Sequence, residues 1–269
     1  MGIAYLGIGV GGMLVPQIAK KLNMEFGWHQ ALMLLGILMI IMALPMAWFV
    51  KDNPDGKLNE PKKEEPKISL QSILKSWPFY LLLIGSMCSI GAVSGTSQNL
   101  KLFFSIDLKY TQQESANILS LVLASSIIGR LLMGWLADRI PKKYVMMLIY
   151  TIVAGSIPLL YLADIPGIIY LFAFIFGIGL GGDYMIIPLM AAEIFGIKVM
   201  GRIMGLILTF DGIAEAFSPM LVARLRDIGG SYANGFAALI VLGVIGIITV
   251  SMLPGSGKTQ NAAFAITEK

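Results

Sequence analysis

Residues 129–143 read GRLLMGWLADRIPKK, and they place Arg130 inside an apolar run eight residues before a charged cluster. An unpaired arginine is costly in hydrocarbon, because lipid offers no partner for its charge. Eight residues of helix measure about 12 Å, and an arginine side chain can reach only part of that way towards the membrane surface. Arg130 is therefore expected to face the interior of a helical bundle, near water, a carboxylate or an anionic substrate.

The composition indicates a membrane environment. The chain has 269 residues, of which 57% are hydrophobic and 13% charged, with a mean hydropathy of +0.79. A soluble domain usually carries about 25% charged residues. The basic residues lie in short loops without an aromatic-lined basic face, which argues against nucleic acid as a partner.

Runs of about 20 apolar residues, long enough to cross a hydrocarbon core, recur along the chain. Eight are present, at 2–19, 30–50, 79–100, 114–136, 144–163, 166–190, 203–223 and 233–253. Backbone groups in lipid must be hydrogen-bonded within their own segment, so these runs predict helices. The fold class is therefore an all-α membrane protein with about eight transmembrane helices. Glycines such as Gly177, Gly179 and Gly181 are expected to let helices approach closely.

One long charged connection divides the chain. Residues 51–76 carry three prolines and few apolar side chains, and they predict a linker, in which 68–76 is a candidate surface helix. The expected organisation is a two-helix piece at 1–50, the linker, a six-helix bundle at 77–253 and a tail at 254–269.

The distribution of Lys and Arg predicts the orientation. Thirteen lie in the linker, in 137–143, in 196–202 and in the tail, whereas six lie in the loops of the opposite side. Positive residues accumulate in cytoplasmic loops, so the linker and both termini are expected in the cytoplasm of an inner or plasma membrane protein.

Three acids also interrupt apolar sequence. Asp183 lies in GLGGDYMIIPLM, and Asp211 and Glu215 lie in LTFDGIAEAFSPM. Residues at i and i+4 share one helix face, and two carboxylates there hinder each other's ionisation, which suits a group that takes up and releases protons. The alternative is that the acids only neutralise Arg130. Pro188 and Pro219 are expected to break or kink the helices that carry these acids.

The loop after Arg130 carries a recognisable pattern. Gly134, Asp138, Arg139, Lys142 and Lys143 follow the spacing G-x-x-x-D-R-x-x-K-K between two apolar runs. This resembles the loop signature of the major facilitator superfamily. The resemblance implies that the glycine lets two helices approach and that the Asp-Arg pair braces their cytoplasmic ends. The alternative is an ordinary positively charged cytoplasmic loop.

The chain also resembles the monocarboxylate transporter branch of that superfamily, including its oxalate/formate-type relatives. The resemblance places Arg130 where an eighth-helix arginine contacts the substrate carboxylate, and Asp211 where animal members carry a glutamate. Ser126 stands where the family often has an acid. Further similarity is carried by Gly7, Gly11-Gly12, Pro16 and Gly27-Trp28, and by Phe195-Gly196, Gly201, Gly205, Pro219, Arg224 and Asp227. The alternative for Arg130 is a structural ion pair with Asp211 or Glu215.

The family has twelve helices in two halves, so the resemblance implies that this chain corresponds to helices five to twelve. Helices one to four would be absent, with the chain a fragment that begins at an internal methionine or a shortened product. A complete carrier that works by alternating access needs both halves.

These observations predict a secondary transporter that moves a small organic anion, a mono- or dicarboxylate, by alternating access. Arg130 and Asp211 would bind the substrate, and Asp211, Glu215 and Asp183 would couple transport to protons. The alternative is a truncated, non-transporting membrane protein that needs a partner. No enzyme, cofactor or metal site is expected, because His29 is the only histidine and Cys88 the only cysteine.

Overall fold

Helices make up all of the regular secondary structure in the described part of the chain. The computed structural model describes residues 2–49 and 73–254. The predicted linker 51–76 is described only from residue 73 onwards, so four residues of its candidate surface helix 68–76 are described. Nearly all of the predicted tail 254–269 lies outside the described residues. The element order is α1 (Gly2–Phe49), α3 (Trp77–Leu102), α4 (Gln112–Ala137), α5 (Lys142–Ser156), α6 (Ile168–Phe195), α7 (Met200–Gly229) and α8 (Ala233–Ser251).

Seven helices in the described ranges are long and apolar enough to cross a membrane. They are Lys21–Phe49, Trp77–Asp107, Gln112–Ala137, Lys142–Leu162, Ile168–Phe195, Met200–Gly229 and Ala233–Ser251. These seven match the last seven predicted spans. The first predicted span, 2–19, is helical as the N-terminal part of α1, although it is not among the seven.

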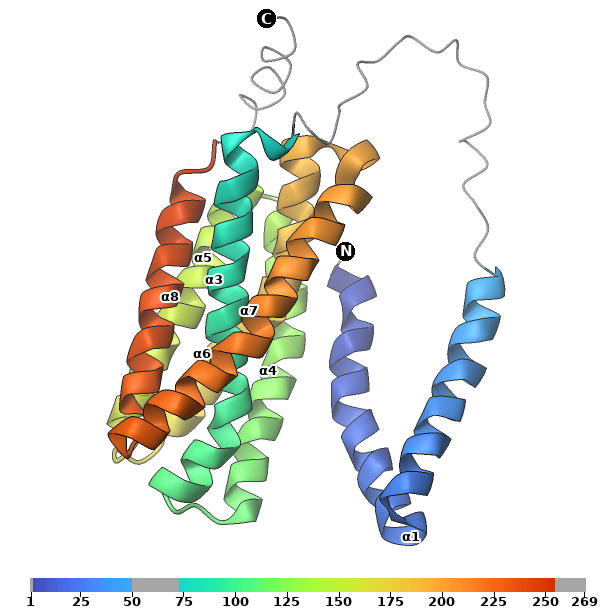
Figure 1. The fold of residues 1–269 in the computed structure, drawn as a ribbon, viewed down its shortest axis with the longest axis vertical. Helices are drawn as coiled ribbons and strands as arrows, with labels where there is room; N and C mark the ends of the chain where they lie inside the picture. The colour runs from blue at the N-terminus through green and yellow to red at the C-terminus, as the bar shows by residue number, and fades with distance from the viewer. Residues whose placement is uncertain (1, 50–72, 255–269) are drawn as a thin grey trace, which may run out of the picture. The chain divides into compact units, whose positions relative to one another are not determined.

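Helix α1 bends at a single glycine. The sequence predicts a loop over 20–29, but these residues continue the helix, with a break only at Gly27 (Figure 1). Gly27 has φ 77° and ψ 163°, a conformation that glycine adopts readily because it has no Cβ. One residue therefore makes the turn that the sequence assigns to a longer loop.

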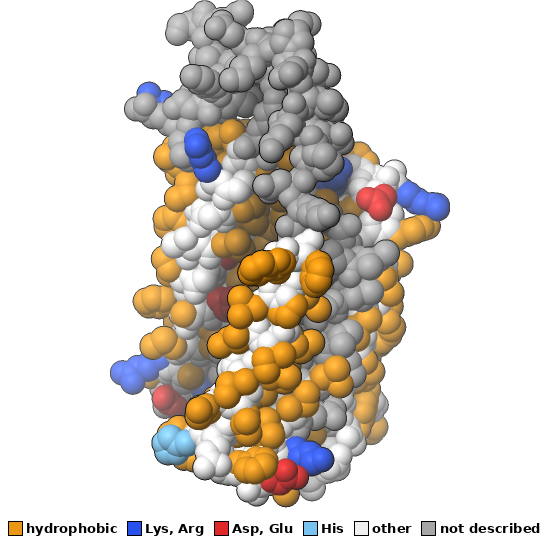
Figure 2. All heavy atoms as spheres, turned by 90° about the vertical axis from the view of Figure 1, so that its right-hand side faces the viewer, with side chains coloured by type: hydrophobic (Ala, Val, Ile, Leu, Met, Phe, Trp, Pro, Cys, Tyr) orange, Lys and Arg blue, Asp and Glu red, His pale blue; other side chains and the backbone are white. Residues whose placement is uncertain are grey.

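Helices α3 to α8 lie side by side as a bundle, with α3 at its centre (Figure 1). A π-helical turn, Phe103–Asp107, extends α3, and a 3-10 turn, Ile157–Leu162, extends α5. Figure 2 shows one face of the molecule, on which hydrophobic side chains predominate and charged ones lie mostly near the ends. Large apolar side chains such as Leu208, Phe217 and Met220 are exposed, as expected for surfaces that contact lipid.

Glycines bring α4 and α6 into backbone contact. A Cβ at Gly181 would lie 2.0 Å from the carbonyl oxygen of Ser126, and one at Gly177 would lie 2.5 Å from that of Val122. On the other helix, a Cβ at Gly129 would lie 2.2 Å from the carbonyl oxygen of Ile178. The predicted close approach at Gly177 and Gly181 is confirmed, and it follows from the absence of side chains at these points.

The sequence predicts that each of the two prolines breaks or kinks its helix, and neither proline breaks it. Pro188 lies within α6 and Pro219 within α7. Pro219 cannot donate to the carbonyl of Glu215 four residues earlier, and the hydroxyl of Ser94 on α3 donates to that oxygen instead, at 2.8 Å. The amide of Asn99 donates to the carbonyl oxygen of Pro219 at 3.3 Å. Ser94 of α3 thus replaces the backbone hydrogen bond that α7 lacks at Glu215, and Asn99 adds a second contact between the two helices.

The bundle has two apolar clusters that divide it along its length. One includes Leu82, Met146 and Ile186, and the other includes Phe104, Phe172 and Phe236. On α6 the first cluster begins at Met185 and the second ends at Phe176, so residues 177–184 lie where the clusters meet. Asp183 belongs to this level, which lies within the span.

Candidate functional site

Asp211 and Asp183 are held from the same face of α3. The hydroxyl of Ser86 donates to Oδ1 of Asp211 on α7 at 2.7 Å, and the hydroxyl of Ser89 donates to Oδ1 of Asp183 on α6 at 2.8 Å. Positions i and i+3 of a helix are neighbours on its surface, with Cβ atoms about 5–6 Å apart. The two serines therefore draw two predicted acids, 28 residues apart in sequence, into one polar cluster, and the carboxyl groups interact electrostatically.

This cluster is buried and incompletely hydrogen-bonded. Asp183 is 0% exposed and Asp211 4% exposed. Within the described residues, Oδ2 of each acid has no hydrogen-bond donor. The hydroxyl of Tyr150 on α5 lies beside Ser89. The Tyr150 hydroxyl interacts electrostatically with both acids and is 1% exposed as a residue. Buried polar groups are normally paired, so two unpartnered carboxylate oxygens in one place indicate a functional site rather than a contribution to stability.

Glu215 differs from the two aspartates in its exposure. It is exposed in the described structure, and its Oε1 accepts a hydrogen bond from the hydroxyl of Tyr184 at 3.3 Å. Asp211 and Glu215 are one turn apart on α7, but Asp211 points to α3 and Glu215 to Tyr184 on α6. A helix neighbour at i+4 is rotated by about 40°, which is enough to move a side chain from a buried face to its edge.

Arg130 is buried on α4 at the level of the cluster. It is 5% exposed, and the backbone nitrogen of Arg130 faces Gly181, two residues before Asp183. Nη1 of Arg130 donates to the hydroxyl oxygen of Ser126 at 3.2 Å, while the Ser126 hydroxyl donates to the carbonyl of Leu123. Among the described residues no carboxylate forms an ion pair with Arg130, including Asp211 and Glu215. The guanidinium charge is therefore solvated by a neutral serine alone within this part of the chain.

The predicted signature loop runs from the end of α4 to the start of α5, where its two lysines contact two other helices. The amide of Asp138 donates to the carbonyl of Gly134 and ends α4, and the guanidinium of Arg139 lies 4.1 Å from the ring centre of Trp135. Nζ of Lys142 pairs with Glu193 at the end of α6 at 2.9 Å.

Nζ of Lys143 donates to the carbonyls of Ser251 and Leu253 at the end of α8. In the described structure the two lysines make these contacts between helices, whereas Arg139 stacks on its own helix.

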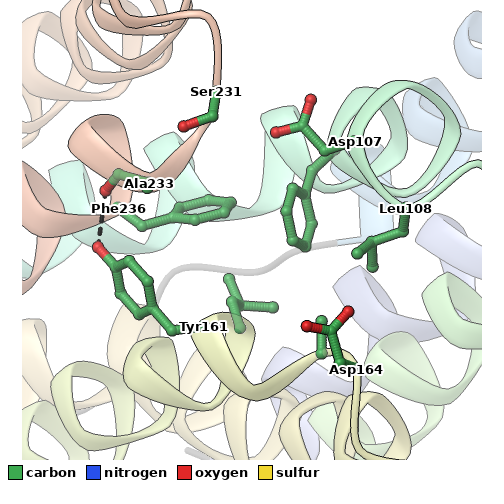
Figure 3. Close-up of a pocket in the computed structure, with 10 residues that line it drawn as sticks. Asp107, Leu108, Tyr161, Asp164, Ser231, Ala233 and Phe236 are labelled. Carbon is green, nitrogen blue, oxygen red and sulfur yellow. Dashed lines mark hydrogen bonds between the residues drawn. The ribbon is translucent and has the colours of Figure 1, made fainter.

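A pocket of about 180 Å³ opens at the other end of the bundle (Figure 3). Asp107, Asp164, Phe103, Tyr161 and Phe236 contribute to its lining, and the hydroxyl of Tyr161 donates to the carbonyl of Ala233 at 2.6 Å. None of the sequence-predicted site residues lines it. Asp107 already accepts from the amide of Tyr232 and pairs with Arg226, so the pocket wall is part of the framework between α3, α7 and α8.

Sequence reasoning missed the partners of the acids. Ser86, Ser89 and Tyr150 lie inside apolar runs. Serine and tyrosine are common there and do not indicate a site by themselves. The available signal was the i, i+3 spacing of Ser86 and Ser89, which places two hydroxyls on one face of a span.

The comparison with family models decides the family. The model described as Major Facilitator Superfamily matches residues 1–219 and 101–265. The chain belongs to the major facilitator superfamily. Seven helices of its described residues are long and apolar enough to span a membrane, so this facilitator protein is an integral membrane protein.

Curated relatives of the chain include monocarboxylate transporters and another MFS transporter. The facilitator chain is 25% identical to human monocarboxylate transporter 12 over 268 residues, covering 87% of this chain and 52% of the relative. It is 26% identical to MFS transporter asaE of Aspergillus flavus (95% and 59%) and 25% identical to monocarboxylate transporter 13 of Bos taurus (96% and 58%). The chain thus spans about half to three fifths of the length of these relatives.

A solved structure supports the fold. The E. coli fucose:proton symporter FucP aligns with a TM-score of 0.63 at 14% identity, covering 90% of this chain and 60% of that one. At this identity the likeness establishes the fold alone.

Proposed function

We propose that this facilitator protein contributes to secondary transport of a small organic anion, a mono- or dicarboxylate, across the cell membrane. The observation that carries the proposal is Arg130, which is 5% exposed and has no ion-pair partner among the described residues. A buried guanidinium needs an anion, and its planar fork suits a carboxylate through two parallel hydrogen bonds.

The surroundings of Arg130 support a site for a small ligand. Ser126 accepts one hydrogen bond from the guanidinium, which leaves its other N–H groups for a second acceptor. Gly181 allows α6 to lie against α4 at this level, close to Asp183 and hence to Asp211. Asp211, Asp183 and Glu215 are the candidates for coupling anion movement to protons, with Asp211 also a candidate for substrate contact.

The proposed orientation places the linker, both termini and the loop of Asp138 to Lys143 in the cytoplasm. It is supported by the excess of Lys and Arg on that side. The proposed organisation treats 77–253 as one half of the carrier and 1–50 as part of the other half.

Reconstitution tests the proposal. The full-length native protein is placed in proteoliposomes and supplied with radiolabelled lactate, pyruvate, formate or oxalate under an inward proton gradient. The proposal predicts saturable uptake of at least one of them, reduced by unlabelled carboxylate and by collapse of the gradient. Absence of uptake of every carboxylate by correctly inserted protein would favour a non-transporting membrane protein.

A further inference from the structure

Three acids are candidates for proton coupling, but the structure separates them by environment. Asp183 and Asp211 are buried, and each is hydrogen-bonded through one oxygen to a serine of α3. Glu215 is exposed, and among the described residues its side chain is hydrogen-bonded only to Tyr184. A proton carried through a hydrophobic span is best held by a group that water does not reach in that conformation.

Ser86 can satisfy Asp211 in both of its protonation states. Its oxygen lies 2.7 Å from Oδ1 of Asp211 and 3.0 Å from the carbonyl oxygen of Leu83, yet a hydroxyl has only one hydrogen. When Asp211 is ionised, Ser86 donates to the carboxylate. When Asp211 is protonated, the acid donates to the Ser86 oxygen and Ser86 donates to Leu83. Neither state leaves the hydroxyl unpaired.

Asp183 and Tyr150 complete the arrangement. Ser89 is one turn along α3 from Ser86 and donates to Asp183, and the Tyr150 hydroxyl lies beside Ser89. Oδ2 of Asp183 and Oδ2 of Asp211 have no hydrogen-bond donor within the described chain. An ionised carboxylate is unstable when it is buried with no hydrogen-bond donor to one of its oxygens, whereas a neutral carboxyl group needs fewer donors. The geometry therefore suits carboxyls that carry protons in this conformation.

No basic side chain among the described residues offsets the two acids. The titratable groups facing the cluster, apart from the acids themselves, are Cys88 on α3, Tyr150 on α5, Tyr184 on α6 and Glu215 on α7. On α4, Arg130 forms no ion pair with either acid in the described structure, and residues 233–251 of α8 contain no titratable side chain. Two buried acids without a cation beside them form a site for a small cation. A proton is the cation that needs the least room.

We propose that Asp183 and Asp211, positioned by Ser89 and Ser86 of α3, form the proton-binding pair of this protein, with Tyr150 beside them, and that Glu215 is outside it. The inference rests on the proposed function and narrows its coupling site. It also separates the proton pair on α6 and α7 from the anion contact of Arg130 on α4. Of these helices, α4 and α6 meet at Gly181.

Infrared difference spectroscopy of the purified native protein in nanodiscs tests the pair directly. Spectra at successive pH values report the C=O stretch of each buried protonated carboxyl. We expect Asp183→Asn and Asp211→Asn each to remove part of this signal. Asn keeps the shape of the side chain and can still accept from the serine, so both variants preserve the local packing.

Serine variants provide the second measurement. Ser89→Ala and Ser86→Ala remove a donor that stabilises the ionised carboxylate, so the protonated signal should persist to higher pH in both. Ser97→Ala is the matched control, because the Ser97 hydroxyl donates to Val93 of its own helix and should leave the spectra unchanged. Signals that are the same in wild type, Asp183→Asn and Asp211→Asn would overturn the inference. Because carboxyl protonation is read without any uptake, a pair that titrates in a protein that moves no carboxylate would overturn the proposed function alone.

Discussion

The hydroxyl of Ser86 lies 2.7 Å from a carboxylate oxygen of Asp211, and this contact joins α3 to α7 across 125 residues of sequence. One turn further along α3, Ser89 makes the same kind of contact with Asp183 on α6. The central helix of the bundle thus holds two buried acids on two different helices. A movement of α6 or α7 away from α3 would break one of these hydrogen bonds, which links the state of the acids to helix packing.

Neutralising the acids should uncouple transport from protons. We predict that Asp183→Asn and Asp211→Asn abolish accumulation of carboxylate under an inward proton gradient, and that Asp183→Asn retains exchange of labelled for unlabelled carboxylate across proteoliposomes. Exchange needs the substrate contact but no net proton movement. Accumulation at the wild-type level in both variants would contradict the assignment of these acids to coupling.

The contact between α4 and α6 should not tolerate a methyl group. We predict that Gly181→Ala lowers stability by about 1–3 kcal/mol, because its Cβ would lie 2.0 Å from a backbone oxygen that cannot rotate away. Gly155→Ala is the control, because a Cβ there meets nothing within 4 Å. Thermal unfolding in detergent should show a clearly lower Tm for Gly181→Ala and little change for Gly155→Ala. Equal Tm values would show that the helices separate easily.

The hydrogen bond from Ser94 to the carbonyl of Glu215 should matter only because Pro219 is present. Ser94→Ala should cost about 1 kcal/mol, since it leaves that carbonyl unpaired. In a Pro219→Ala background the restored backbone N–H can take over this bond, so the same serine change should cost less. A double-mutant cycle of unfolding free energies measures the difference, and strictly additive effects would count against this role.

The lysines of the loop should differ in importance. Lys143→Met removes a donor from two carbonyls at the end of α8, and we expect faster amide hydrogen exchange in the last turn of that helix. Lys142→Met removes a partly exposed ion pair with Glu193, for which the expected loss is below about 1 kcal/mol. Amide hydrogen exchange of both variants tests whether Lys143 matters more than Lys142. An unchanged exchange rate in the last turn of α8 in Lys143→Met would contradict this prediction.

The sequence predicted the spans well because hydrophobic length is a local property. The run around Arg130 predicted a buried arginine, since lipid excludes the alternatives, and the structure places it at 5% exposure. The glycines at 177 and 181 predicted close helix contact, because residues without a side chain let the backbones of two spans approach each other.

The partners of the acids could not be predicted from local patterns. Ser89 and Ser97 look alike in sequence, yet Ser89 bonds to Asp183 on another helix and Ser97 bonds to its own. The choice depends on how α3 is rotated against α6 and α7, which is a tertiary property. The same rotation exposes Glu215 while burying Asp211, although both lie on one stretch of α7.

The most direct test of the proposed anion site is uptake by Arg130 variants of the full-length native protein. Carboxylate uptake into proteoliposomes is compared for wild type, Arg130→Ala, Arg130→Lys and the exposed control Arg202→Ala, at matched membrane insertion. We predict no uptake for Arg130→Ala, strongly reduced uptake for Arg130→Lys, because an ammonium cannot form the paired bonds of a guanidinium, and normal uptake for Arg202→Ala. Wild-type uptake by Arg130→Ala would contradict the assignment of Arg130 as the substrate contact.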